Sequence, residues 1–224
     1  GIVLGSHGLF TWGDTSYECY INSLEVIEKA SSYIEKKVKE NGSVFGGQKI
    51  ESLPADQRKD QAAKLMPLLR GLASSENRMI GHFTDSDTVL QFINSNDLEK
   101  LAPMGTSCPD HFLRTKIQPL ILDLDKNADL DDTEAVLAQL EPSFEQYRQE
   151  YKDYYESCKH DNSPTMRDPN PVIIIFPGVG MFSFAKNKQT TRVASEFYIN
   201  AINVMRGAEA ITSYTSLPRQ EAFD

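Results

Sequence analysis

The chain has 224 residues, and its 32 acidic residues against 23 lysines and arginines leave a formal net charge of −9. That charge argues against nucleic acid and anionic membranes as general partners, because binding phosphate requires concentrated positive charge. We find no apolar run long enough to cross a bilayer and no charged-then-apolar leader. The three cysteines, Cys19, Cys108 and Cys158, are far apart and show no metal spacing, which predicts reduced thiols in a cytoplasmic protein.

A strand, a turn and a long helix are predicted at the start of the chain. Residues 2–4 are typical of a buried strand, and residues 9–12 continue in extended form after the break at Ser6-His7-Gly8. Asp14 and Thr15 can cap a helix that we expect to end near Asn41-Gly42. The apolar face of this helix holds Tyr17, Tyr20, Leu24, Ile27 and Ile34. Because Gly1 rather than Met precedes a strand-like run, we expect a piece of a longer polypeptide.

The next segment is polar and rich in glycine, and it predicts a connector over residues 42–62. A short helix over residues 62–73 is expected to follow, weakened by Pro67. From Arg78 the pattern becomes globular, with predicted strands at 79–83, 119–122 and 172–176 and predicted helices at 87–93 and 133–157. Strands mixed with long helices predict an α/β layered domain in which helices cover a sheet.

The predicted helix at 133–157 carries apolar and aromatic residues at spacings of three and four. Pro142 lies inside it, so we expect a kink, or a break followed by a restart. Its tyrosines, Tyr147, Tyr151 and Tyr154, allow two interpretations. Packing against the core of the protein is favoured over an aromatic binding surface.

The end of the chain repeats its beginning. Residues 174–184 align with residues 2–12 at a shift of 172 positions, and residues 196–204 align with 18–26 after a six-residue insertion. Each copy is a strand, a turn containing glycine, a second extended stretch and an amphipathic helix, which favours duplication over chance similarity. His7 aligns with Val179, so the second copy lacks the imidazole and cannot bind a metal at that position.

Two further groups of residues are candidates for binding. His111 follows a turn and, with Asp110, Arg114 and Lys116, forms either an anion pocket or a satisfied surface and capping cluster. Residues 123–134 have the ligand spacing of a calcium loop, but Ala128 stands where that loop requires glycine. The alternative for this segment is an acidic helix N-terminus. His82 and His160 have no partner at metal spacing, which predicts structural or solvated roles.

A family likeness rests on several of these segments. The stretch GSHGLFTWGDTSYECY (5–20) resembles the C-terminal strand, turn and helix of the class II aldolase/adducin family. CPDHFLRTK (108–116), VIIIFPGVGMF (172–182), ASEFYINAINVMRGAEAI (194–211) and SLPRQEAFD (216–224) resemble the middle region of bifunctional rhamnulose-1-phosphate aldolase/alcohol dehydrogenases. The likeness is weakest across 36–68 and 123–160. In those proteins an aldolase domain is joined through such a region to a short-chain dehydrogenase.

The resemblance implies a three-layer α/β/α class II aldolase-like fold with an internal strand-turn-helix repeat. Residues 1–41 would be the end of an aldolase domain, 42–77 a connector and 78–224 a degenerate aldolase-like linking domain. His7 would be the third zinc ligand, and its two partner histidines and the acidic base would lie before Gly1. The resemblance also places the NAD-binding turn of the dehydrogenase beyond Asp224. The G-x-G of Gly178 and Gly180 is not a substitute for that turn, because no third glycine and no downstream ribose-binding acid accompany it.

The activity implied is zinc-dependent cleavage of a ketose 1-phosphate to dihydroxyacetone phosphate and lactaldehyde, in a cytoplasmic homo-oligomer. Zinc would polarise the sugar phosphate substrate as a Lewis acid. No catalytic residue is assigned in the 224 residues, which we expect to be inactive alone. The alternative is a non-catalytic assembly or binding module on an aldolase-like fold.

Overall fold

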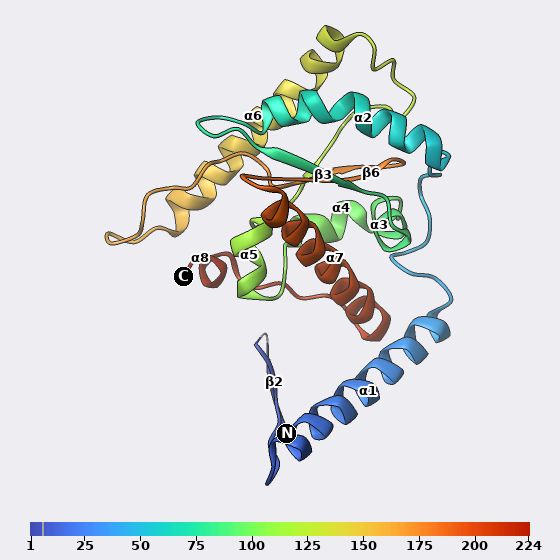
Figure 1. The fold of residues 1–224 in the computed structure, drawn as a ribbon, viewed down its shortest axis with the longest axis vertical. Helices are drawn as coiled ribbons and strands as arrows, with labels where there is room; N and C mark the ends of the chain where they lie inside the picture. The colour runs from blue at the N-terminus through green and yellow to red at the C-terminus, as the bar shows by residue number, and fades with distance from the viewer. Residues whose placement is uncertain (6) are drawn as a thin grey trace.

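The computed structural model describes residues 1–5 and 7–224, which form a mixed α/β structure as predicted (Figure 1). Its strands are β1 (Ile2–Leu4), β2 (Gly8–Phe10), β3 (Ile80–Thr84), β4 (Leu120–Ile121), β5 (Ile173–Phe176) and β6 (Gly180–Ala185). Its helices are α1 (Ser16–Asn41), α2 (Ala55–Leu72), α3 (Asp87–Ile93), α4 (Leu98–Leu101), a 3₁₀ turn (Ala102–Met104), α5 (Pro109–Thr115), α6 (Thr133–Cys158), α7 (Lys188–Ile211) and α8 (Arg219–Phe223).

Four strands form the central sheet in the order β3-β6-β5-β4. β6 is antiparallel to both neighbours, and β4 runs parallel to β5. All four residues of β5 are buried, as expected for a short run of β-branched and aromatic residues in the middle of a sheet.

Helices lie on both faces of this sheet, and the alternation of side chains along β5 divides the core between them. Ile174 and Phe176 join one apolar cluster with residues of α2 and α6. Ile173 and Ile175 join a second cluster with residues of α3, α4 and α7. Figure 1 shows α2 and α6 on one side of the sheet and α7 on the other.

The start of α2 differs from the predicted one, and of the kink or break predicted at Pro142 the structure excludes the break. α2 begins at Ala55 rather than at residue 62, because tertiary contacts hold its polar first turns. Arg58 there pairs with Asp85 at 2.9 Å and donates to the Leu53 carbonyl at 2.7 Å. α6 runs without a break past Pro142. Buried side chains on both sides of the proline, Leu140 and Phe144 among them, anchor the helix to the core and compensate for the missing N–H.

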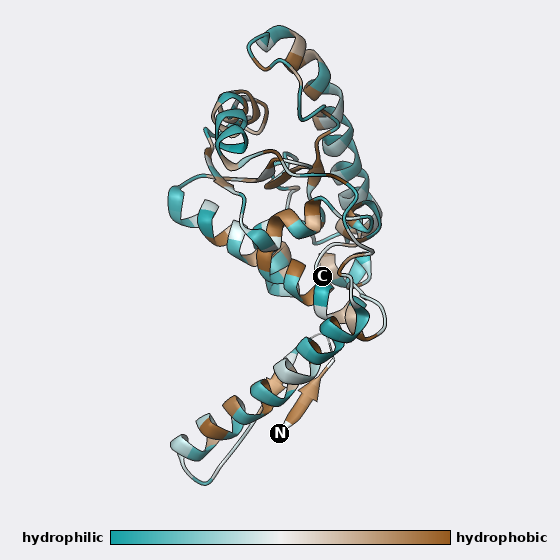
Figure 2. Cartoon of the chain, turned by 90° about the vertical axis from the view of Figure 1, so that its right-hand side faces the viewer, coloured by the Kyte–Doolittle hydropathy of each residue, from teal (hydrophilic) through white to brown (hydrophobic). Residues whose placement is uncertain are grey.

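The N-terminal hairpin and α1 form a separate arm (Figures 1 and 2). α1 begins at a capping box between Thr15 and Glu18 and ends at Gly42, whose φ of 70° is the left-handed value that favours glycine. The C-terminal half of α1 packs on α7, where Glu35 pairs with Arg206 at 2.9 Å. The hairpin and the first turns of α1 extend away from the sheet.

The two hairpins of the chain share one register. β1 and β2 pair Ile2 with Phe10, Val3 with Leu9 and Leu4 with Gly8. β5 and β6 pair Ile174 with Phe182, Ile175 with Met181 and Phe176 with Gly180. Each pair of the first hairpin, moved by the 172 positions of the sequence alignment, is a pair of the second. The duplication itself stays a prediction, but its alignment agrees with the strand pairing.

Candidate functional site

His7 lies in the turn between β1 and β2, where its side chain is exposed. Its backbone N–H donates to the Leu4 carbonyl at 3.1 Å, and its ring stacks at 6.3 Å from that of Phe10. Among residues 1–5 and 7–224, no three His, Cys, Asp or Glu side chains are grouped to hold a metal ion. A catalytic zinc requires about three protein ligands. The described residues therefore do not fit a complete zinc site.

The equivalent turn of the second hairpin is closed. Val179, the counterpart of His7, is fully buried. Gly178 has a φ of 83°, its N–H donates to the Asn94 side-chain oxygen at 2.6 Å, and its carbonyl accepts from the Leu53 N–H at 2.9 Å. β6 and not a helix follows this G-x-G, so it does not form a dinucleotide-binding turn, as predicted.

The four residues considered either for an anion pocket or for a surface and capping cluster separate in the structure. Asp110 and Arg114 are exposed on α5. His111 is buried against Phe197 of α7, with the ring centroids 4.8 Å apart. Burial lowers the pKa of His111, against the opposing effect of Asp110. Lys116 follows α5 and points instead toward α6.

Lys116 is the candidate residue with the most unusual environment. Its Nζ lies 4.1 Å from the centre of the Tyr151 ring and donates to the backbone carbonyl of Asp168. Burial lowers the pKa of Lys116 to about 7; Asp168 opposes this shift and Arg167 adds to it. Burial also raises the pKa of Tyr151. This amine can therefore change its charge near neutral pH.

Arg167 and the ring of Tyr151 complete this environment, and neither was predicted as part of a site. Both line the same cavity as Lys116. The spacing of Tyr151 on its helix suggested core packing, and Arg167 lies in a polar loop without a motif. The one signal in the sequence was the aromatic surface that we considered for residues 133–157 as the less favoured alternative.

The carboxylates of the acidic segment 123–134 form mainly local hydrogen bonds. Asp125 and Asp129 accept from backbone N–H groups two residues further on, and Asp132 caps α6 by accepting from Ala135 N–H at 3.1 Å. Asp131 pairs with Lys64 at 2.8 Å. The arrangement favours the acidic helix N-terminus over a calcium loop.

The remaining histidines and the cysteines have ordinary surroundings. His82 lies on β3 opposite Ser183, and His160 bonds Asp224 at 2.9 Å. The three cysteines are free, and Cys158 is buried. These positions are compatible with the structural or solvated roles predicted for both histidines.

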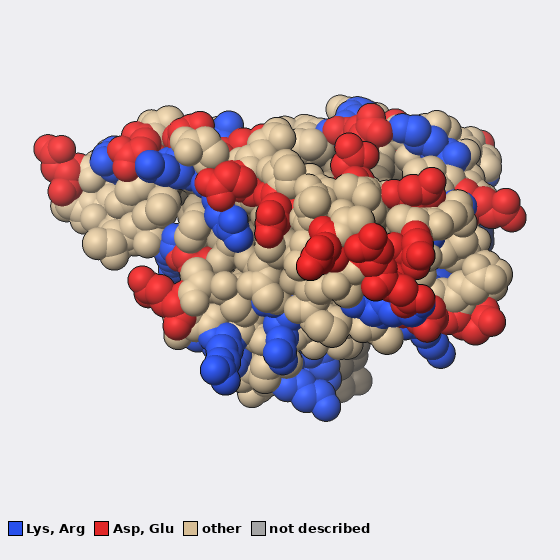
Figure 3. Space-filling view, turned by 90° about the horizontal axis from the view of Figure 1, so that it is seen from above, with Lys and Arg blue, Asp and Glu red and all other residues tan. Residues whose placement is uncertain are grey.

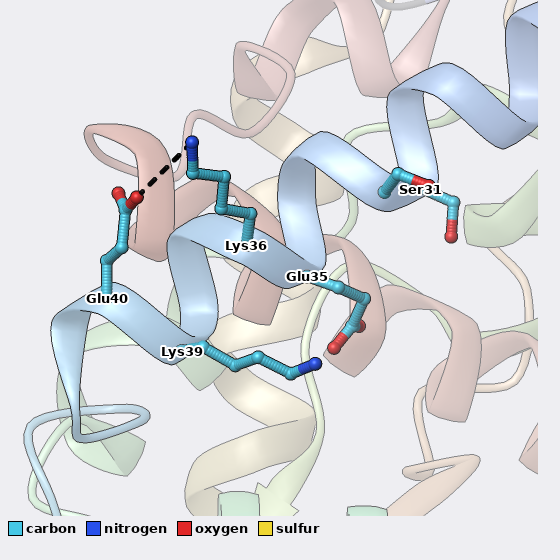
Figure 4. A pocket seen from close by; sticks show the side chains of 6 residues that line it. Ser31, Glu35, Lys36, Lys39 and Glu40 are labelled. Carbon is cyan, nitrogen blue, oxygen red and sulfur yellow. Dashed lines mark ion pairs between the residues drawn. The ribbon is translucent and has the colours of Figure 1, made fainter.

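A shallow hollow on α1 is shown in Figure 4. Its residues all come from one helix, and two of them, Lys36 and Glu40, pair at 3.8 Å. Glu35 is held by Arg206 from α7. A groove on one helix with paired charges offers no convergent set of groups for a ligand.

The surface seen in Figure 3 carries acidic and basic side chains interspersed, without one continuous basic patch on that face. Within the part of the chain that the structure describes, no helix combines the length and the apolar character needed to span a bilayer.

Comparison with known proteins identifies the family. Residues 60–224 match the sequence model described as "Aldolase class II, second domain", and the chain belongs to this family. It is 34% identical over 222 residues to a protein of Bacillus subtilis (strain 168) named "Uncharacterized oxidoreductase YuxG". The match covers 99% of this chain and 32% of that protein, so the chain spans about a third of the relative's length. No solved structure matches the chain.

Proposed function

We propose that this chain is the linking region of a cytoplasmic polypeptide that combines a zinc-dependent class II aldolase of the rhamnulose-1-phosphate type with an NAD-dependent short-chain dehydrogenase. Residues 1–41 contribute the last hairpin and helix of the aldolase, and His7 contributes one of its zinc ligands. The following unit packs its own version of that hairpin in a closed core. Taken alone, the 224 residues bind the metal weakly and do not cleave the sugar phosphate.

The contrast between the two hairpins carries this proposal. The two hairpins have the same register. β5 and β6 lie inside a four-stranded sheet, whereas β1 and β2 form a sheet of two strands whose apolar side chains contact water. Val3 is 73% exposed and its counterpart Ile175 is fully buried. A hairpin of two strands is marginally stable alone. The first hairpin is therefore suited to join further strands, which would bring ligands to His7.

The relative adds support of a different kind. Its match extends over nearly the whole chain, including the arm that lies outside the family match at residues 60–224. The arm and the closed unit thus occur together in a longer protein that is named as an oxidoreductase.

The test compares the 224-residue chain with a longer polypeptide of the relative's size that contains it. Both are assayed for cleavage of rhamnulose 1-phosphate with zinc present, and zinc content is measured. We expect activity only in the longer polypeptide. Its His7→Ala variant should lose this activity and bind zinc more weakly, because one of the zinc ligands is removed. Glu28→Ala on the exposed part of α1 is the matched control. Cleavage by the 224-residue chain alone would overturn the proposal.

The exposed apolar arm also favours the second candidate, a non-catalytic module that assembles into homo-oligomers. Sedimentation of the isolated chain separates the two. A concentration-dependent dimer that dissociates in a Val3→Asp variant, together with an inactive longer polypeptide, would favour assembly over catalysis.

A further inference from the structure

A cavity of about 430 Å³ lies where four segments distant in sequence meet. They are α5 with the two residues that follow it, the second half of α6, residues 164–168 and α8. The volume falls within the range of about 300–1,000 Å³ that small-molecule sites occupy. Rings from α6 and α8 form much of the wall, and Phe223 packs edge-on against Tyr154 at 5.9 Å. Such walls fit a flat or apolar group.

The amine of Lys116 and the guanidinium of Arg167 line this cavity, and neither is paired with a carboxylate. Among the residues that the structure describes, neither Lys116 nor Arg167 takes part in an ion pair, although several other lysines and arginines do. The carboxylate of Asp168 also lines the cavity, where it accepts from the Asn170 N–H at 2.8 Å and from the Ser75 hydroxyl at 2.6 Å and forms no ion pair with the amine or the guanidinium. In a chain with a net charge of −9, an unpaired guanidinium beside an amine that can take up a proton favours an anionic ligand.

The backbone at Lys116 adds an independent observation. Its φ is 60° and its ψ is −178°, a backbone conformation that is essentially confined to glycine. A side chain at such a position costs about 1–3 kcal/mol of strain. Capping the helix requires only the backbone, which donates from Lys116 N–H to the Phe112 carbonyl at 3.1 Å. The capping bond does not require a lysine here, and the side chain at this strained position lies with its amine against the Tyr151 ring.

We propose that this cavity binds a small organic anion, with its phosphate or carboxylate between Lys116 and Arg167 and its apolar part against the rings of Tyr154 and Phe223. The inference does not depend on the proposed aldolase assignment, because these residues all lie outside residues 1–41, which carry the proposed zinc ligand. An anion stabilises the protonated amine, so Lys116 takes up a proton when the ligand binds at pH 8.

The experiment uses the 224-residue protein and isothermal titration calorimetry at pH 8. Phenyl phosphate and benzoate distinguish a phosphate from a carboxylate, inorganic phosphate tests for free phosphate, and benzyl alcohol tests the apolar part alone. Titrations in buffers of different ionisation enthalpy measure the proton uptake. The variants are Lys116→Met, Lys116→Arg and Arg167→Ala, and Lys188→Met at the distant start of α7 is the matched control.

We expect one aromatic anion to bind and to bind at least about tenfold more weakly in the Lys116→Met and Arg167→Ala variants, since each loses a charge-assisted hydrogen bond. The control should bind as the wild type does. Lys116→Arg should retain binding and lose the proton uptake, because arginine stays charged. The proposal is overturned if Lys116→Met binds the anion as the wild type does, or if no anion binds at 5 mM, a concentration that corresponds to a binding free energy of roughly −3 kcal/mol. It is also overturned if benzyl alcohol binds as tightly as the anions, or if inorganic phosphate binds as tightly as phenyl phosphate.

Discussion

Replacing Lys116 with methionine should change how the stability of the protein depends on pH. The pKa of Lys116 is lowered from 10.5 to about 7 by burial. Between these values the unfolded chain holds a proton that the native protein has released. The free energy of unfolding therefore rises as the pH increases through this window, by at most about 1.36 kcal/mol per pH unit.

The size of the effect follows from that window. Over the two units from pH 7 to pH 9 the upper limit is about 2.7 kcal/mol, and we expect about 1–2 kcal/mol because part of the side chain still contacts water. The charged neighbours, Asp168 and Arg167, act on the amine in opposite directions. Methionine keeps the apolar length of the chain and removes the titrating group.

The assay is urea denaturation followed by circular dichroism at pH 7, 8 and 9, for the wild type and Lys116→Met. The difference between the two proteins isolates Lys116 from other groups that titrate in this range. As the pH rises, the free energy of unfolding of the wild type should increase relative to that of the variant. A difference that stays constant within about 0.3 kcal/mol across the three pH values would refute the reasoning, because it would place a fully charged lysine in the cavity.

Other predictions concern the closed turn, the start of the arm and the acidic segment. Asn94→Ala should lower the free energy of unfolding by about 1–3 kcal/mol, because the buried Gly178 N–H loses its acceptor; exposed Asn96→Ala is the control in urea denaturation, and equal effects would contradict this. Thr15→Ala should lower the stability of the N-terminus of α1 by about 1 kcal/mol and speed hydrogen exchange in its first turn about fivefold. Unchanged exchange would mean that the capping box does not stabilise this end of the helix. Millimolar Ca²⁺ should leave the melting temperature unchanged, since the carboxylates of residues 123–134 serve local turns, and a thermal rise lost in Asp129→Asn would show a calcium site after all.

The elements that the sequence predicted well are those with local signals. α1 begins after Thr15 and ends before Gly42 as predicted, because a hydroxyl cap and a left-handed glycine act within one turn of the chain. The helix predicted at 87–93 is α3. The first turns of α2 carry no apolar period, and their helix depends on a contact between Arg58 and Asp85 across 27 residues. Such a contact is not visible in a local pattern.

The candidate site was predictable only in part for the same reason. Lys116 was singled out by its sequence neighbours, but the structure turns it away from His111, which is buried on α7. Its environment comes from Tyr151 and the loop at Arg167, which only the packing of α6 brings to the end of α5. Spacing along a helix indicates a shared face and leaves open whether that face meets the core, a cavity or solvent.

The two hairpins illustrate how far local information extends. The same spacing of strand residues around a short turn produces the same pairing, so Ile2 meets Phe10 as Ile174 meets Phe182. The burial of these side chains depends on neighbours that the hairpin does not encode. Around the second hairpin β3 and β4 extend the sheet and helices cover its faces, and the turn that aligns with His7 is closed by Asn94. Equal registers therefore leave the surroundings of the two turns undetermined, since Val179 is buried whereas His7 is exposed.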